Sequence, residues 1–119
     1  MKFYKFEGNK EVYPLFAGEI PAGAVEVAAN KTEAAFEKHI PDLHKVEGGL
    51  EVCVGSVAHP MLDVHYIEWI LLVNGSEIKV KTLKPGEEPK ACFEVEKYEE
   101  GAEVFAFCNL HGLWSKVVE

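Results

Sequence analysis

The feature that most constrains the fold is a series of short alternating segments, separated by turn residues, in the C-terminal two thirds of the chain. These segments predict β-strands at residues 50–54, 66–73, 77–83, 91–96 and 103–108. Asn74-Gly75 is a strong signal for a two-residue β-hairpin, and residues 84–89 form a loop by composition. Short strands at regular spacing predict an all-β sandwich or barrel.

The remaining sequence contains little helix signal. Only residues 32–38, with Thr32 as a candidate N-cap, favour one or two helical turns. Residues 1–16 are rich in aromatic side chains but only weakly periodic, and residues 20–24 are typical of a loop.

The length and net charge of the chain limit the classes of function that it can have. A chain of 119 residues with 48% hydrophobic residues is sufficient for one folded domain with a core. Its formal net charge of -8 argues against nucleic acid or an anionic membrane surface as a partner. The sequence shows neither a membrane-spanning apolar run nor a signal-peptide pattern, so we expect a cytoplasmic protein.

The chain has three cysteines and no CxxC pair, which is a poor framework for disulfides. Alternation in the predicted strands places Cys53 and Cys92 on faces that also carry glutamates. We expect both to be free thiols, near the surface or at a subunit contact.

Five potential metal ligands lie in three short segments of the sequence: His39, His59, His65, Cys108 and His111. Four imidazoles and one thiolate are more donors than a tetrahedral zinc site uses. The set suits a redox metal held by five protein atoms with one position left open. His44 lacks a partner motif and is not expected to be a ligand.

The donor set favours iron but leaves two alternatives. Iron accepts five ligands, and a thiolate opposite the open position increases the electron density on a bound oxygen species. A blue-copper electron carrier is the first alternative, but no methionine follows His111 in residues 112–116, where the weak axial ligand is expected. The second alternative is a binding module stabilised by zinc.

Glu37 and Lys38 directly precede the candidate ligand His39. A carboxylate at that place can occupy the open position of an oxidised ion. An ammonium there can attract a small anion against the negative charge of the whole protein. The alternative interpretation of the pair is a solvated charged turn.

The segments that carry these residues closely resemble the superoxide reductase family, which includes desulfoferrodoxin and neelaredoxin. The resemblance covers about residues 30 to 117, and its matching segments are residues 37–41, 57–61, 65–69, 83–86 and 108–114. It implies an immunoglobulin-like β-barrel with a mononuclear non-haem iron. It also implies one-electron reduction of superoxide to hydrogen peroxide.

The resemblance further implies a role for each site residue. The equatorial iron ligands would be His39, His59, His65 and His111, with Cys108 as the axial thiolate. Glu37 would take the sixth position once iron is ferric, and Lys38 would steer superoxide and help protonate the bound peroxide. An external carrier, for which the family suggests rubredoxin, would restore ferrous iron. The family also implies a homo-oligomer, either a dimer or a tetramer.

The N-terminus departs from one branch of this family. Desulfoferrodoxins carry an extra domain that holds a second iron on four cysteines, but this chain has no cysteine before Cys53. We therefore expect no second iron centre. Residues 1–29 are interpreted as an N-terminal extension, either a relic of that domain or a simple addition, and residues 30–119 as the iron-binding β domain.

Overall fold

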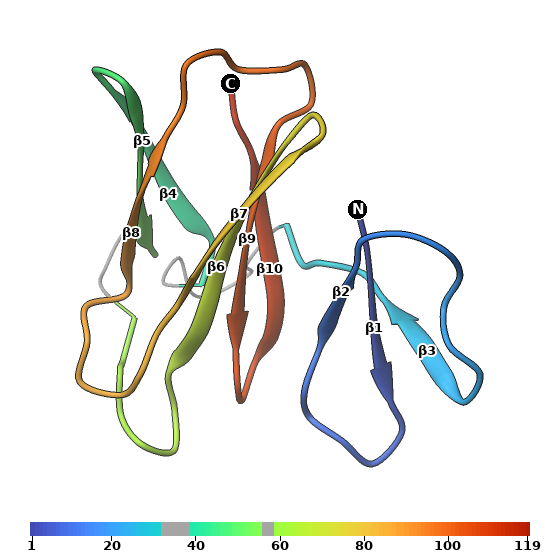
Figure 1. Ribbon diagram of the computed structural model, residues 1–119. Coiled ribbons are helices and arrows are strands. Elements are labelled where there is room, and N and C mark those ends of the chain that lie inside the picture. The colour runs from blue at the N-terminus through green and yellow to red at the C-terminus, as the bar shows by residue number, and fades with distance from the viewer. Residues whose placement is uncertain (32–38, 56–58) are drawn as a thin grey trace.

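The computed structural model describes residues 1–31, 39–55 and 59–119, and within these ranges it contains β-strands and no helix (Figure 1). The strands are β1 (Lys2–Phe6), β2 (Tyr13–Leu15), β3 (Ala24–Val27), β4 (Pro41–Val46), β5 (Gly49–Val54), β6 (Ile67–Asn74), β7 (Glu77–Thr82), β8 (Lys90–Glu94), β9 (Glu103–Cys108) and β10 (Gly112–Val117). The all-β prediction is confirmed. The predicted helical turns at residues 32–38 lie outside the described residues. In the described part of the chain, no helix is long and apolar enough to cross a membrane.

Two antiparallel sheets form a sandwich, one with the strand order β10-β9-β6-β7 and the other β4-β5-β8. Alternation along each strand directs every second side chain between the sheets. The core between them includes Leu50, Val52 and Val54 from β5, Ile70 and Leu72 from β6, and Val104 and Ala106 from β9. These side chains are almost completely buried, so the sandwich provides a rigid scaffold for the loops at its ends.

A third sheet, β2-β1-β3, lies beside the sandwich and packs against the outer face of β6, β9 and β10 (Figure 1). Phe3 from β1 contacts Phe105 with ring centroids 4.7 Å apart and stacks against Trp69 at 6.0 Å. The central strands β6 and β9 are thus covered on both faces, whereas β7 is largely exposed. This explains why β9 is apolar along most of its length, with five consecutive buried residues.

The five predicted strands are confirmed, with ends that differ from the prediction by at most two residues. The predicted hairpin turn is wrong by one residue, because Asn74 pairs with Glu77 and leaves Gly75-Ser76 as the loop. Gly75 has a φ of 61°, a left-handed conformation that favours glycine at the first central position. The sequence analysis did not predict β1 to β4 or β10.

Candidate metal centre

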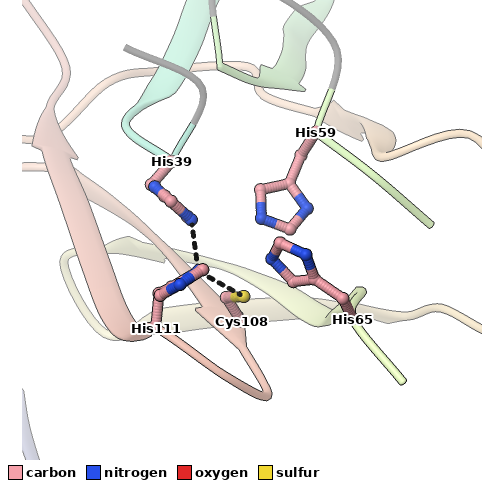
Figure 2. Close-up of side chains that lie close together, drawn as sticks. All are labelled: His39, His59, His65, Cys108 and His111. Carbon is pink, nitrogen blue, oxygen red and sulfur yellow. Dashed lines mark hydrogen bonds between the residues drawn. The ribbon is translucent and has the colours of Figure 1, made fainter. Parts of the chain in front are cut away.

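All five predicted ligands converge at one end of the sandwich (Figure 2). Their potential ligand atoms lie within 4.8 Å of one another. His39 lies two residues before the start of β4, and the loop before β6 supplies His59 and His65. Cys108 ends β9, and His111 lies in the connection to β10. Antiparallel pairing of β6 with β9 and of β9 with β10 brings two of these three segments together.

The four imidazole rings form a closed square in the order His39, His59, His65, His111. Neighbouring ring centroids are 4.7 to 4.9 Å apart, and each ring stands edge-on to the next, with interplanar angles of 62° to 83°. The sulfur of Cys108 lies 3.8 Å from Nδ1 of His111. Four nitrogens around a centre and one sulfur beside them form a set of donors that suits a single ion.

The hydrogen bonds of His59 indicate which of its nitrogens faces the centre. Nδ1 lies 2.7 Å from the carbonyl oxygen of Pro60, to which it can donate, while Nε2 is buried with no hydrogen-bond partner among the described residues. A buried polar atom of this kind is costly unless a ligand satisfies it. Burial, with a smaller effect from the neighbouring imidazoles, lowers the pKa of His59 to about 4. His59 is therefore neutral at pH 7, and its Nε2 lone pair is available to an ion.

His39 and His111 also approach each other through atoms that can bind an ion. Nε2 of His39 lies 3.0 Å from Nδ1 of His111. The same Nδ1 is the atom near the Cys108 sulfur. His111 therefore faces the centre through Nδ1, while His39 and His59 face it through Nε2.

Cys108 is the last residue of β9 and is fully buried. Burial raises the pKa of its thiol, while hydrogen bonds from the backbone N–H groups of Leu110 and His111 lower it. The neighbouring backbone N–H of Asn109 does not serve the sulfur, because it donates to the carbonyl of Tyr66 at 3.2 Å. A cation beside the sulfur favours the thiolate further.

The side chain of Asn109 connects two of the ligand-bearing segments. Its Oδ1 accepts the backbone N–H of Tyr66 at 2.9 Å, and its Nδ2 donates to the carbonyl of Val64 at 3.2 Å. These residues flank His65, so Asn109 fixes the loop of His65 against the loop of Cys108 and His111. Sequence analysis missed this role. The one available signal was an asparagine, a residue that often binds nearby backbone groups, between two ligands.

Trp114 is a second supporting residue that the sequence analysis missed. Its ring stacks on His39 with centroids 4.8 Å apart and an interplanar angle of 15°. Its Nε1 donates to the carbonyl of His111 at 3.1 Å. One side chain on β10 therefore orients ligands from two segments, which is the kind of outer contact that fixes imidazole geometry at metal sites.

Other candidate residues lie apart from the cluster. His44 is exposed on β4 and hydrogen-bonds Asp42 at 2.9 Å. Cys53 is half-buried, Cys92 is exposed, and both are free thiols, as predicted. Glu37 and Lys38 lie outside the described residues.

The donors fit iron better than either alternative. Five ligands of this type exceed the four of a structural zinc site. Met61, which lies between His59 and His65 in the sequence, accepts the N–H of Ile67 through its sulfur at 3.4 Å. No methionine follows His111, so the axial ligand of a blue-copper site is missing.

The fold and the site together define a class, an all-β protein with a mononuclear metal centre built from four imidazoles and one thiolate. A family model described as desulfoferrodoxin matches residues 31–117. The chain belongs to the desulfoferrodoxin family.

Individual relatives agree with this assignment. A desulfoferrodoxin of Clostridium acetobutylicum is 45% identical over 89 residues, which cover 75% of this chain and 69% of that protein. The crystal structure of the superoxide reductase from Treponema pallidum is similar with a TM-score of 0.69 and 35% identity, covering 84% of this chain and 90% of that one. The superoxide reductase (1Fe-SOR) from Giardia intestinalis has a TM-score of 0.61 and 35% identity, covering 70% and 98%.

Proposed function

We propose that this chain is a superoxide reductase. The reaction adds one electron and two protons to superoxide and yields hydrogen peroxide, without release of oxygen. The observation that carries the proposal is the convergence of four imidazoles and one thiolate within 4.8 Å, in a chain similar to proteins named superoxide reductase.

The five residues that would hold iron are His39, His59, His65, Cys108 and His111. When bound there, iron supplies the one-electron step by cycling between its ferrous and ferric states. Neutral imidazoles and one thiolate carry a single negative charge, so a divalent ion in this set keeps a net positive charge. That residual charge favours an anionic substrate in a protein whose overall charge is -8.

The protein's own groups tune the sulfur and keep the site open to the solvent. The N–H groups of Leu110 and His111 hydrogen-bond the Cys108 sulfur, which stabilises its negative charge and moderates its electron donation. His111 is exposed, whereas His39 and His59 are buried. The cluster therefore lies at the surface, where superoxide and protons from the solvent can reach it.

Glu37 and Lys38 are proposed to complete the site because they directly precede His39 in the chain. The Lys38 ammonium would attract superoxide and organise the water that delivers protons. The Glu37 carboxylate would take the open position once the ion is oxidised. Both roles follow from the sequence and the family resemblance.

A one-electron reductase needs a donor, and we propose a small external electron carrier, with rubredoxin as the candidate that the family suggests. Exposed apolar side chains surround the ligand loops: Leu62, Val64 and Leu110. Exposed apolar groups near a surface redox centre support a transient protein contact. A homo-oligomeric state, dimer or tetramer, and a cytoplasmic location stay predictions from the sequence.

The stoichiometry of peroxide tests the function. With a reductant present, a superoxide reductase forms one hydrogen peroxide for each superoxide consumed. A dismutase forms half as much and releases oxygen. Formation of only one hydrogen peroxide for every two superoxide ions consumed would contradict the proposal. Loss of superoxide no faster than in buffer alone would also contradict it.

Lys38→Ala tests the steering role against a matched control, Lys97→Ala. Lys97 carries the same charge and lies in the turn after β8, at the other end of the sandwich. We expect Lys38→Ala to slow the bimolecular step with superoxide and flatten its dependence on ionic strength, because a local charge contributes most. Stopped-flow or pulse-radiolysis kinetics measure both effects. Equal rates and equal salt slopes in the two variants would show that Lys38 is only a surface charge.

A further inference from the structure

Two cysteines with no role in the metal site share the outer face of the β4-β5-β8 sheet. In the β5–β8 ladder Cys53 is opposite Lys90, and Glu51 is opposite Cys92. The residues between them, Val52 and Ala91, are buried in the sandwich core. Because strand side chains alternate, both cysteines point outward, on neighbouring strands.

The hydrogen-bond pattern shows that these outward pairs are the close ones. The backbone N–H of Val54 donates to the carbonyl of Pro89 at 2.8 Å, which marks that adjacent position as hydrogen-bonded. The Cys53–Lys90 and Glu51–Cys92 positions are therefore of the non-hydrogen-bonded type, in which side chains approach more closely. Cys53 and Cys92 occupy the diagonal between them, and a negative charge on Cys92 raises the pKa of Cys53.

A disulfide across this diagonal needs only a small movement of one strand. Diagonal Cα atoms are roughly 7–8 Å apart, slightly beyond the roughly 4.4–6.8 Å that a disulfide spans. The strand β8 is at the edge of its sheet, so it can shift or twist locally along β5 without breaking a second ladder.

A single lysine, Lys90, supplies positive charge beside the two thiols in the β5–β8 ladder. Lys90 lies opposite Cys53 and two residues before Cys92, so its ammonium faces both thiols. The positive charge of Lys90 lowers the pKa of Cys53, against a larger increase from burial and smaller ones from Glu51 and Asp42. Lys90 also lies 3.6 Å from a Glu51 oxygen, which shares its charge. Cys92 is exposed, and we therefore assign it the first attack on an oxidant in solution.

We propose that Cys53 and Cys92 form a peroxide-sensitive dithiol that is oxidised to a disulfide linking β5 and β8. The proposed function enters only as the local source of hydrogen peroxide. The Cys92 thiolate attacks one peroxide oxygen, the O–O bond breaks, and the hydroxide that leaves becomes water, giving a sulfenic acid. The Cys53 thiolate then attacks that sulfur, the S–O bond breaks, and a second water leaves. Two thiols are oxidised, and one peroxide is reduced to two waters.

The test is peroxide titration of the iron-loaded full-length protein, followed by alkylation and intact mass measurement without reductant. We expect two of the three thiols to become resistant to alkylation and the mass to fall by two hydrogens. Proteolysis should yield a Cys53–Cys92 peptide pair, and dithiothreitol should restore both thiols. Cys108, which is fully buried, should keep its sulfur unmodified.

Three variants and one control make the test decisive. Cys53→Ser and Cys92→Ser should each abolish the intramolecular disulfide. Lys90→Met should slow its formation several-fold, whereas Lys5→Met on β1, an exposed lysine in another sheet, should not. Oxidation of Cys92 to sulfinic acid while Cys53 still reacts with the alkylating reagent would overturn the proposal. Disulfides that link separate chains instead would also overturn it.

A second experiment separates this proposal from the proposed function. A superoxide source with a reductant, compared with and without catalase, tests whether turnover supplies the peroxide. A disulfide formed with added peroxide but not above background during turnover supports the dithiol and contradicts the reductase. Peroxide produced in turnover, with no disulfide at any added peroxide concentration, supports the reductase and overturns the dithiol.

Discussion

Two asparagines, at opposite ends of the sandwich, make the same types of hydrogen bond to the backbone. Among the described residues, only one of these ends contains a cluster of potential metal ligands. Asn109 accepts the N–H of Tyr66 and donates to the carbonyl of Val64. At the other end of β6, Asn74 accepts the N–H of Glu99 at 2.7 Å and donates to the carbonyl of Lys97 at 2.8 Å. Each side chain thus fixes one strand end to a distant loop.

The two ends differ in the side chains that the fixed loops present. Near Asn74 a cavity of about 750 Å³ is lined by charged residues, including Glu77, Glu94, Glu96, Glu99 and Glu100, all of which are exposed. Near Asn109 the ligand nitrogens and the sulfur are largely buried and face one another. Exposed carboxylates remain solvated, whereas buried neutral donors need a partner. The asparagine hydrogen bonds are present at both ends and fix the loops. Only the end where donor atoms are buried and face one another can bind a metal ion.

The largest expected effect comes from removing the two side-chain hydrogen bonds of Asn109 beside the metal-binding cluster. Asn109→Ala leaves the Tyr66 amide and the Val64 carbonyl without their partner and frees the loop of His65. We expect iron affinity to fall roughly 10–100-fold, the usual cost of losing an outer contact at a metal site. Competition with a chelator measures the affinity.

Asn74→Ala is the matched control for that variant. It removes the same two types of hydrogen bond at the far end of β6. We expect it to lower the free energy of unfolding by about 1–3 kcal/mol and to leave iron affinity unchanged. Equal losses of iron affinity in the two variants would show that the asparagine hydrogen bonds affect iron binding only through the stability of the whole fold.

The next effect concerns protons at the buried imidazole of His59. The folded pKa is lowered to about 4, so between pH 4 and 6.5 the unfolded chain binds a proton that the folded apoprotein does not. Stability of the apoprotein therefore rises with pH through this window. Lowering the pH from 7 to 5 should therefore decrease the free energy of unfolding by about 2 kcal/mol through His59.

Urea unfolding of the apoprotein at several pH values measures this slope. His59→Gln should flatten it, and His44→Gln, at an exposed histidine on β4, should not. Identical pH profiles in the wild type and both variants would contradict the burial of a neutral imidazole at this position.

The smallest effect tests the contact between the N-terminal segment and β6. Burial, and then the charge of Glu11 and a hydrogen bond to it, raise the pKa of Glu68 to about 7. Between pH 4.5 and 7 the folded protein thus keeps a proton that the unfolded chain releases, and stability falls as the pH rises. Glu11→Gln should flatten this slope and change stability by less than about 1 kcal/mol, because the pair is partly exposed. Glu100→Gln, at the far end, should leave the slope unchanged.

The site was predictable from the sequence to a greater degree than the fold. The five clustered residues could be found because imidazoles and a thiol in short, ordered motifs carry chemistry that few other structures need. The supporting roles of Asn109 and Trp114 could not, since each depends on contacts between segments that only the tertiary structure brings together.

Strands were predictable where one face of a sheet is buried and alternation is clear, as in β5. The N-terminal sheet was missed because its burial is uneven: Phe3 is buried, whereas Tyr13 and Val25 are exposed. The strand β10 was missed because Leu113 and Trp114 were interpreted as part of the ligand motif. The interpretation of residues 1–29 as an N-terminal extension, either a relic of an iron domain or a simple addition, stays a prediction, as do the roles of Glu37 and Lys38.

The most direct test of the central claim is metal analysis of the purified protein, with visible spectra before and after mild oxidation, for the wild type and Cys108→Ser. A four-imidazole, one-thiolate iron centre predicts about one iron per chain and a thiolate-to-ferric absorption band that appears on oxidation. Cys108→Ser should lack this band. Zinc or copper at that stoichiometry, or iron with an unchanged spectrum in Cys108→Ser, would contradict the proposed centre.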